Sequence, residues 1–294
     1  MLIDLHVHST ASDGTLQPPE IVEAAGARRF AAIALTDHDN CDGIAEFIAG
    51  GDAGGPLLVP GVELSIEPGD GFDRFHLLGL GVNPEDAGLR RFLAKILVGR
   101  NERNVKIIEN FRRIGIAMGD EINSYAHGDV LARPHFARWL VDHRHASSVA
   151  DAFERYLLSD SPAETRCYEE RYHPSQEEAF AAVHGAGGIC VMAHPRYWRR
   201  EWRFSGPDFA VAERELAALK ERGLDGLESI YQANTAEEDV AFTRIAERLG
   251  LLKTAGSDFH GRNKPDISLG MDVSDSFAAP VLERLAGLGT CFGG

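Results

Sequence analysis

Short apolar runs alternate with amphipathic segments along most of the chain. Apolar residues run continuously, or alternate with polar ones, at 2–8, 31–37, 57–64, 75–82, 188–193, 226–231 and 253–258, which predicts strands. Helical periodicity occupies 18–28, 42–49, 175–186, 208–222, 236–249 and 279–288. Strands joined by helices predict a parallel sheet with crossover helices. Seven such strands predict a closed or nearly closed α/β barrel, whose active site lies at the C-terminal ends of the strands.

The alternation stops between residues 84 and 165. The segments 84–113, 129–142 and 147–158 have helical patterns, with turn residues between them. We expect a helical insertion (84–165) after the fourth strand of a barrel formed by residues 1–83 and 166–294. The insertion forms a cap over the rim of the barrel or, alternatively, buttresses its wall.

Composition narrows the protein class. The 294 residues are 44% hydrophobic and 26% charged, as in an ordinary globular protein. Apolar runs stay well short of the ~20 residues of a membrane helix, and the start of the chain lacks the basic segment of a signal peptide. The four cysteines, at 41, 167, 190 and 291, are isolated, which favours free thiols in a reducing compartment. We therefore expect a cytoplasmic protein without membrane association, and the sequence indicates no protein partner.

Charge is unevenly distributed. The net charge is −15, yet residues 90–113 contain eight basic and two acidic residues, a local +6 that leaves −21 for the rest. So acidic a protein is unsuited to general nucleic-acid binding. The basic segment favours a small anionic ligand, and a solvated helix of mixed charge is the alternative.

Histidines and carboxylates gather at the predicted strand ends. In the first strand, His6 and His8 are two residues apart and therefore point to the same face, opposite the apolar residues. Asp258 and His260 repeat this spacing near the other end of the chain. Further donors follow other strands: Asp13, His38, Glu63, His76 and His194. One histidine pair could be structural, but the whole set exceeds the needs of one ion and predicts a multinuclear hydrolytic site.

Two segments are candidates for substrate binding. Lys95, Arg100 and Arg103 lie in the basic segment, and Arg133 and His135 follow in the second helical pattern. Arginine and aromatic residues then alternate from Arg196 to Arg203, including Trp198, just after His194. Such residues can clamp phosphates and stack on a base. The alternative is a loop held in place by buried tryptophans.

Taken together, these motifs resemble the PHP (polymerase and histidinol phosphatase) family, which is related to the amidohydrolase superfamily. The resemblance rests on D-x-H-x-H-S at 4–9, S-D-G at 12–14, T-D-H-D at 36–39, G-V-E at 61–63, His76, A-H-P at 193–195 and S-D-F-H at 257–260. It implies a distorted (β/α)7 barrel and three divalent ions, with Mn favoured over Fe or Zn. The implied ligand sets are His6, His8, Glu63 and Asp258 for the first ion, Glu63, His76 and His194 for the second, and Asp13, His38 and His260 for the third.

The length and the insertion resemble the stand-alone nucleotide-processing members of that family. This implies hydrolysis of the 3′-phosphate of a 3′,5′-nucleoside bisphosphate, with a metal-bound hydroxide as nucleophile and His194 among the catalytic residues. The leaving oxygen is protonated by Asp39 or by a metal-bound water, an alternative that the sequence leaves open. A 5′→3′ exonuclease on short RNA or DNA, a histidinol-phosphate-type phosphatase and a non-catalytic metal-binding module are the other candidate functions.

Overall fold

In the part of the chain that the structure describes, eight strands form a single sheet in the order β7-β6-β5-β4-β3-β2-β1-β8. Their bounds are β1 Leu2–Asp4, β2 Ala32–Leu35, β3 Leu57–Ile66, β4 Phe75–Leu80, β5 Ile189–Met192, β6 Gly226–Tyr231, β7 Leu252–Gly256 and β8 Met271–Asp272. The backbone N–H of Leu5 donates to Ala255, and that of Asp258 donates to His6, so the ends of β1 and β7 also meet. The sheet therefore nearly closes on itself, which confirms the predicted distorted barrel. The short β8 adds an antiparallel edge beside β1.

This structure is a computed structural model that describes residues 1–67, 69, 73–125, 131–199 and 202–293, with Arg203 and Phe204 described by their backbone alone. The predicted helix start at 129–130 lies outside the described residues, as do Arg200 and Glu201 of the arginine-aromatic segment.

One of the seven predicted strands departs from the predicted parallel sheet. β4 is antiparallel to both β3 and β5, so the prediction of an all-parallel sheet is wrong at this strand. β3 ends at Ile66 and β4 begins at Phe75, too close for the crossover helix that a parallel connection needs. The start of β4 therefore lies beside the carboxyl end of β3, with His76 opposite Ser65.

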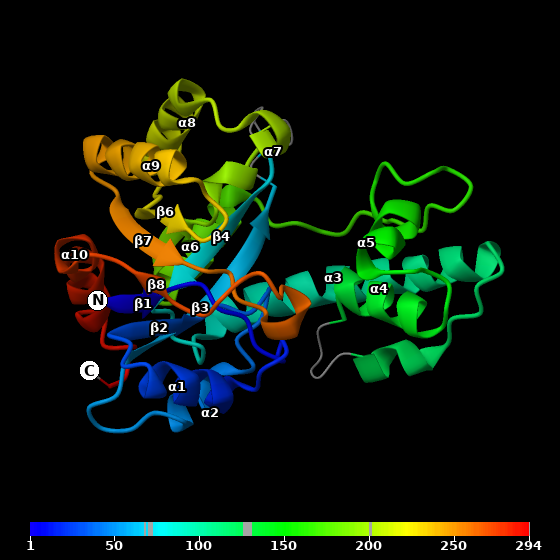
Figure 1. Ribbon diagram of the computed structural model, residues 1–294, viewed down its shortest axis with the longest axis horizontal. Helices are drawn as coiled ribbons and strands as arrows, with labels where there is room; N and C mark the ends of the chain where they lie inside the picture. Colours follow the sequence, from blue (N-terminus) through cyan, green and yellow to red (C-terminus); the bar gives the residue numbers. More distant parts are fainter. Residues whose placement is uncertain (68, 70–72, 126–130, 200–201, 294) are drawn as a thin grey trace.

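Helices cover the outside of the barrel (Figure 1). They are α1 Pro18–Ala27, α2 Ile44–Ala49, α6 Gln176–Gly185, the short α7 Trp202–Ser205, α8 Phe209–Glu221, α9 Ala236–Leu249 and α10 Asp275–Ala286. Ser175, Thr235 and Ser274 accept hydrogen bonds that cap α6, α9 and α10. α10 begins four residues before the predicted 279, because Ser274 provides the cap and Pro280 lies inside the helix.

The insertion is built on one long helix, α3 (Ala87–Arg113), which runs from the barrel into the second body of the molecule (Figure 1). A 3-10 helix (Asp120–Tyr125), α4 (Arg133–Asp142), α5 (Val149–Ala152) and a π-helical turn (Phe153–Leu157) follow. Leu89 and Leu93 at the start of α3 pack in a barrel core, whereas Ile107 and Phe111 pack with Trp139 in a separate core. The boundaries at 84 and 165 stay a prediction. None of the helices that the structure describes combines the length and the apolar composition that crossing a bilayer requires.

Candidate active site

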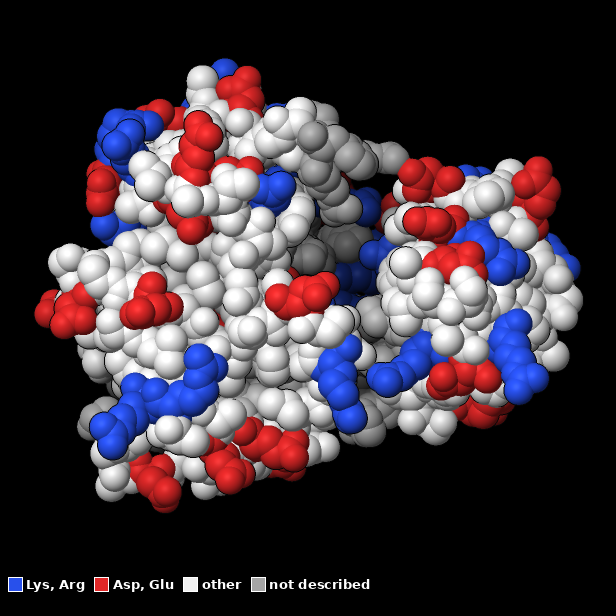
Figure 2. Space-filling view, in the orientation of Figure 1, with Lys and Arg blue, Asp and Glu red and all other residues white. Residues whose placement is uncertain are grey.

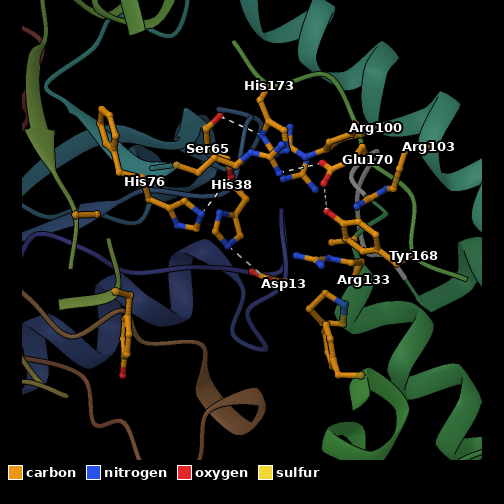
Figure 3. A pocket seen from close by; sticks show the side chains of 18 of the residues that line it. Asp13, His38, Ser65, His76, Arg100, Arg103, Arg133, Tyr168, Glu170 and His173 are labelled. Carbon is orange, nitrogen blue, oxygen red and sulfur yellow. Dashed lines mark hydrogen bonds and ion pairs between the residues drawn. The ribbon is translucent and has the colours of Figure 1, made fainter. Parts of the chain in front are cut away.

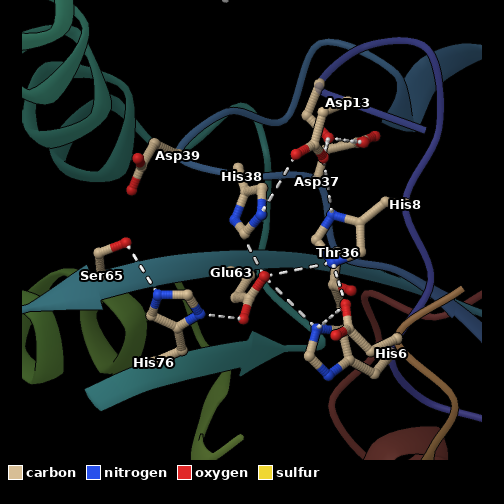
Figure 4. A network of polar contacts seen from close by, with 12 residues as sticks. His6, His8, Asp13, Thr36, Asp37, His38, Asp39, Glu63, Ser65 and His76 are labelled. Atoms are coloured by element: carbon tan, nitrogen blue, oxygen red, sulfur yellow. Dashed lines mark hydrogen bonds and ion pairs between the residues drawn. The ribbon is translucent and has the colours of Figure 1, made fainter. Parts of the chain in front are cut away.

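Glu63, near the middle of β3, stands at the centre of the polar cluster at the barrel rim (Figure 4). Its Oε2 lies 3.4 Å from Nε2 of His6, 3.2 Å from Nε2 of His8 and 2.9 Å from Nδ1 of His38. His6 and His8 follow β1, and His38 follows β2. Two neighbouring strand ends thus aim three imidazoles at one carboxylate oxygen.

The other oxygen of Glu63 faces a second pair of histidines. Oε1 lies 2.7 Å from Nδ1 of His76 and 3.1 Å from Nε2 of His194. His194 follows β5, while His76 is the second residue of β4. Had β4 run parallel to its neighbours, its start would have been at the opposite end of the barrel, so the reversal of β4 brings His76 to this rim.

Asp13, Asp258 and His260 complete the cluster on the side of β7. His260 Nε2 lies 3.2 Å from Asp13 Oδ1, and His38 Nε2 lies 3.8 Å from Asp13 Oδ2. Asp258 Oδ1 lies 3.4 Å from His8 Nε2 and 3.4 Å from His260 Nδ1. The structure therefore brings together the nine residues predicted as ligands: His6, His8, Asp13, His38, Glu63, His76, His194, Asp258 and His260.

The cluster fits bound cations. Potential ligand atoms lie within 4.8 Å of one another in three sets, which are His8, Asp13, His38 and His260; His6, His8, Glu63 and Asp258; and Glu63, His76 and His194. Among the described residues, His6 Nε2, both ring nitrogens of His8, His38 Nδ1 and Glu63 Oε2 are buried without a hydrogen-bond partner. Leaving buried polar atoms unpaired is costly, and metal ions bound in these sets would give them partners.

Electrostatics favours ionised carboxylates in the cluster. Burial acts to raise the pKa of Glu63, but the facing imidazoles of His38 and His76 hold that pKa well below its usual range. Burial opposes ionisation of Asp258 in the same way, and His6 and His260 keep its pKa well below the usual range. Ionised oxygens are the form in which carboxylates coordinate metals.

Glu228 on β6 fixes two of the histidines, although its sequence position did not single it out. The Nδ1–H of His6 donates to Glu228 Oε1 at 3.0 Å, and the backbone N–H of His194 donates to Oε2 at 2.6 Å. This bond leaves the Nε2 of His6 to face the cluster. A Cβ at Gly256 would lie 2.2 Å from Glu228 Oε1 and 2.4 Å from the Cβ of His6, so only glycine fits there. The sequence carried one signal for Glu228, a charged residue within the predicted strand 226–231.

Two buried aspartates hold the loops that carry the ligands. Asp37 accepts hydrogen bonds from the Ser9 N–H (2.8 Å) and the Ser12 hydroxyl (2.5 Å), which shapes the loop leading to Asp13. Asp4 accepts the N–H (3.0 Å) and hydroxyl (2.6 Å) of Ser257. These bonds explain the serines of the sequence motifs, which position metal-ligand candidates rather than bind metal themselves.

Three site residues have left-handed backbone conformations. Asp39, His194 and Asp258 have φ values of 55°, 27° and 59°. Residues other than glycine adopt such conformations at a cost, and they concentrate at functional sites.

A cavity of about 360 Å³ separates the cluster from the insertion (Figures 2 and 3). Asp13, His38, His76 and His194 line one side of it. Five arginines line the other side, and we call them the arginine pocket: Arg74, Arg100, Arg103, Arg133 and Arg171. In Figure 2, Lys and Arg side chains are visible in the depth of the hollow between the two bodies.

Asp39 anchors part of the arginine pocket. Its Oδ2 accepts hydrogen bonds from Arg100 Nε at 2.7 Å and from Arg171 Nη2 at 2.9 Å. Burial would raise the pKa of Asp39, but the two guanidinium groups lower it to about 2. The ionised carboxylate of Asp39 positions the two arginines. It holds no proton to donate, so its contacts give no support to the prediction that Asp39 protonates the leaving group.

Arg74 pairs with Glu67 and, at 2.9 Å, with Glu170, whereas Arg103 and Arg133 form no ion pair with the described residues. Burial, with Arg100 and Arg133 nearby, lowers the pKa of Arg103 to about 9. Its Nη2 is buried without a hydrogen-bond partner among the described residues. Burial likewise lowers the pKa of Arg133, whose guanidinium lies 5.5 Å from the centre of the Tyr168 ring. A bound anion would relieve this repulsion.

Three predicted substrate-binding residues lie outside this cavity. Lys95 pairs with Glu178 at 2.7 Å on the outer surface of α3. His135 is used within the insertion, where its Nδ1 accepts the N–H of Ala132 at the start of α4. Arg196 forms an ion pair with Glu238 of α9.

Trp198 lines the edge of the cavity, but its side chain is buried against Phe75 and Trp202. Its indole N–H donates to the carbonyl of Asp73 at 3.2 Å. These contacts match the alternative reading, in which tryptophans hold this loop in place.

Sequence analysis missed several residues beside the cluster. Arg74 and Arg171 flank the cavity from segments without periodicity, so only the fold could bring them there. On the opposite side, Lys264 Nζ lies 2.5 Å from Asp258 Oδ2, and the Tyr231 hydroxyl donates to the same oxygen at 3.1 Å. Asp258 thus turns Oδ1 to the cluster and Oδ2 to these two partners.

Comparison with known proteins places these features in context. Residues 4–133 match the PHP domain family model. The chain is 34% identical over 261 residues to a 3′,5′-nucleoside bisphosphate phosphatase of Chromobacterium violaceum, covering 88% of this chain and 87% of the relative. It is 32% identical over 269 residues to the 5′-3′ exoribonuclease Rnm of Escherichia coli, covering 88% and 85%.

Solved structures show the same architecture. An amidohydrolase from Chromobacterium violaceum, with bound sulfate and no metal, superposes with a TM-score of 0.83 at 31% identity, covering 99% of this chain and 97% of the other. A protein from Bifidobacterium adolescentis, assigned as a metal-dependent phosphoesterase, superposes with a TM-score of 0.79 at 30% identity, covering 96% of each chain.

Proposed function

Since the chain belongs to the PHP domain family, we propose that it is a metal-dependent phosphatase that removes the 3′-phosphate of 3′,5′-nucleoside bisphosphates. The products are a 5′-nucleotide and inorganic phosphate. The observation that carries this proposal is the shared cavity, in which a ligand cluster for the reacting phosphate faces an arginine pocket for a second phosphate. The bisphosphate phosphatase of Chromobacterium violaceum, similar over 88% of the chain, supports the same assignment.

The ligand cluster would hold up to three divalent ions, with Mn proposed ahead of Fe or Zn. Glu63 is placed to share its two oxygens between the set with His6 and His8 and the set with His76 and His194. Mixed imidazole and carboxylate donors suit all three metals. Ions bound there would neutralise charge on the reacting phosphate and activate water for attack on phosphorus.

The arginine pocket would bind the phosphate that is not cleaved. Arg103 is the strongest candidate, because it is buried with an unpaired Nη2, and Arg133 lies beside it. Asp39 holds Arg100 and Arg171 in place, and Arg171 Nη1 is held further by the carbonyl of Tyr172 at 3.1 Å. Each charge-assisted hydrogen bond to the phosphate would contribute roughly 1.5–3 kcal/mol.

A 5′→3′ exonuclease is the second candidate. The Rnm exoribonuclease of Escherichia coli is 32% identical, and the residues that bind a 5′-phosphate would serve either substrate. A histidinol-phosphate-type phosphatase is less favoured, since five arginines exceed what a substrate with one phosphate and a cationic amine requires.

The test compares kcat/KM for a 3′,5′-nucleoside bisphosphate, a 5′-phosphorylated trinucleotide and histidinol phosphate at the same Mn concentration. We expect the bisphosphate to have the highest value. A clear preference for the trinucleotide would replace the phosphatase assignment by the exonuclease. A preference for histidinol phosphate would contradict the proposal that the arginine pocket binds a second phosphate of the substrate.

A further inference from the structure

A further group of potential metal ligands lies at the opposite end of the barrel from the ligand cluster. His184 is the penultimate residue of α6, Cys190 is the second residue of β5, and Asp225 directly precedes β6. Among the described residues, these three are the one set outside the ligand cluster whose potential ligand atoms all lie within 4.8 Å of one another. β5 and β6 are parallel, so their starts share this end of the barrel, whereas His194 follows β5 at the rim.

Hydrogen bonds hold Cys190 and Asp225 side by side. The N–H of Asp225 donates to the carbonyl of Cys190 at 2.8 Å, and the N–H of Cys190 donates to Asp225 Oδ2 at 2.8 Å. His184 Nε2 lies 2.7 Å from the same carboxylate oxygen. Gly223 has a φ of 118°, and a Cβ there would lie 3.3 Å from His184 Cε1, so the glycine leaves room for the imidazole. The fold itself therefore places the three side chains close together.

The spacing of the three side chains fits a small divalent ion. Zinc bonds of about 2.0–2.3 Å to nitrogen, oxygen and sulfur put the ligand atoms of a tetrahedral site roughly 3.3–3.6 Å apart. Small side-chain adjustments bring the three observed atoms to that spacing. The side chains of His184 and Asp225 are 40% and 33% exposed, whereas Cys190 is buried. An ion held by the three would therefore face solvent, with water as its fourth ligand.

The sulfur of Cys190 distinguishes this set chemically from the ligand cluster. The cluster offers only imidazole and carboxylate ligands, which suit Mn, whereas a thiolate selects softer ions such as Zn. Burial and the carboxylate of Asp225 hold the pKa of the Cys190 thiol well above its usual range, so the thiol carries its proton when no metal is bound. Formation of the sulfur–zinc bond releases that proton to water, and the affinity for zinc therefore rises with pH.

We propose that His184, Cys190 and Asp225 form a zinc site that is separate from the ligand cluster. Bound zinc ties the last turn of α6 to the starts of β5 and β6, and it stabilises this end of the barrel. The site takes no part in cleavage of phosphate esters, so its test does not depend on the proposed function. The chain thus holds Mn at the ligand cluster and Zn at the opposite end of the barrel.

Cobalt(II) is the probe, because a thiolate ligand gives it a near-ultraviolet charge-transfer band that imidazole and carboxylate ligands do not give. The full chain is stripped with a chelator and titrated with cobalt. Cobalt in the ligand cluster does not contribute to this band, since the cluster contains no cysteine. We expect the band in the wild type, its loss in Cys190→Ser, and its retention in the matched control Cys291→Ser, because Cys291 lies outside these ligand sets. A wild type without the band at saturating cobalt, or a Cys190→Ser variant that keeps it, would overturn the site.

Two further variants test the site without changing the barrel core. His184→Ala removes a partly exposed imidazole, and Asp225→Asn keeps an acceptor for the N–H of Cys190 while it removes the charge. We expect each variant to raise the cobalt concentration that gives half of the full band at least about tenfold. His145→Ala, in the insertion, is the control and should leave that concentration unchanged. Wild-type titrations for both His184→Ala and Asp225→Asn would show that Cys190 binds cobalt without them, which contradicts the three-residue site.

Thermal unfolding gives a readout for zinc itself. Zinc should raise the Tm of the wild type more than that of His184→Ala, because zinc in the ligand cluster raises both equally and only the wild type has the second site intact. Equal rises in Tm would contradict the proposal that zinc at His184, Cys190 and Asp225 stabilises the barrel.

Discussion

Glu63 divides the histidines of the site between its two oxygens, His6, His8 and His38 on one and His76 and His194 on the other. Under the proposed function, the two sets that share Glu63 would each hold a divalent cation, and the ionised carboxylate would serve both.

His8→Ala tests the ligand cluster at one residue. Both ring nitrogens of His8 lack a hydrogen-bond partner among the described residues, so its removal takes away metal ligation but no hydrogen bond. We expect elemental analysis to find fewer ions per chain after Mn loading, and activity to fall at least about a hundredfold. His145→Ala, in the insertion, is the control. If the His8→Ala variant kept wild-type metal content and activity, His8 would be excluded as a metal ligand.

Arg133→Ala tests the arginine pocket. Losing one charge-assisted contact of roughly 1.5–3 kcal/mol should lower kcat/KM for a bisphosphate about tenfold to a hundredfold. The matched control is Arg90→Ala, since Arg90 pairs with Glu85 at the surface and lies outside the cavity lining. Equal kinetics for Arg133→Ala and wild type would remove Arg133 from the phosphate site.

At the scale of secondary-structure elements, sequence analysis predicted the features that a local sequence pattern determines. The strands, most helices and the nine ligand candidates follow from periodicity, strand ends and motifs, and the structure brings those nine residues together. The direction of β4 did not follow, because it depends on the short connection after β3 rather than on the pattern of either strand. The placement of Arg171, Glu228 and Lys264 depends on contacts between distant segments of the chain. The periodicity of a single sequence does not report such contacts.

Gly256→Ala tests how β7 supports the site. The added Cβ would meet Glu228 Oε1 at 2.2 Å and the Cβ of His6 at 2.4 Å, so Glu228 must move and release the Nδ1–H of His6. We expect a loss of about 1–3 kcal/mol in the free energy of unfolding, together with weaker metal binding. Gly26→Ala in α1 is the control, because its Cβ would meet nothing within 4 Å. Equal denaturant midpoints and metal affinities for the two variants would contradict this role of β7.

At the scale of the whole molecule, α3 joins the two bodies that face each other across the cavity. Its first turns pack in the barrel core and its last turns in the insertion core, while Arg100 and Arg103 between them face the site. The same helix therefore fixes the distance between the ligand cluster and the arginine pocket. Under the proposed function, this distance would select a substrate with two phosphates, and neither body sets it alone.

The most direct measurement identifies the products that the metal-loaded protein releases from a 3′,5′-nucleoside bisphosphate. The protein is stripped with a chelator, reconstituted with Mn and assayed by chromatography of the nucleotide and by phosphate release. We expect no turnover without metal and, with Mn, one phosphate and one 5′-nucleotide per substrate. Release of the 3′-nucleotide, or turnover that persists after complete metal removal, would contradict the proposed placement of the reacting phosphate at the ligand cluster.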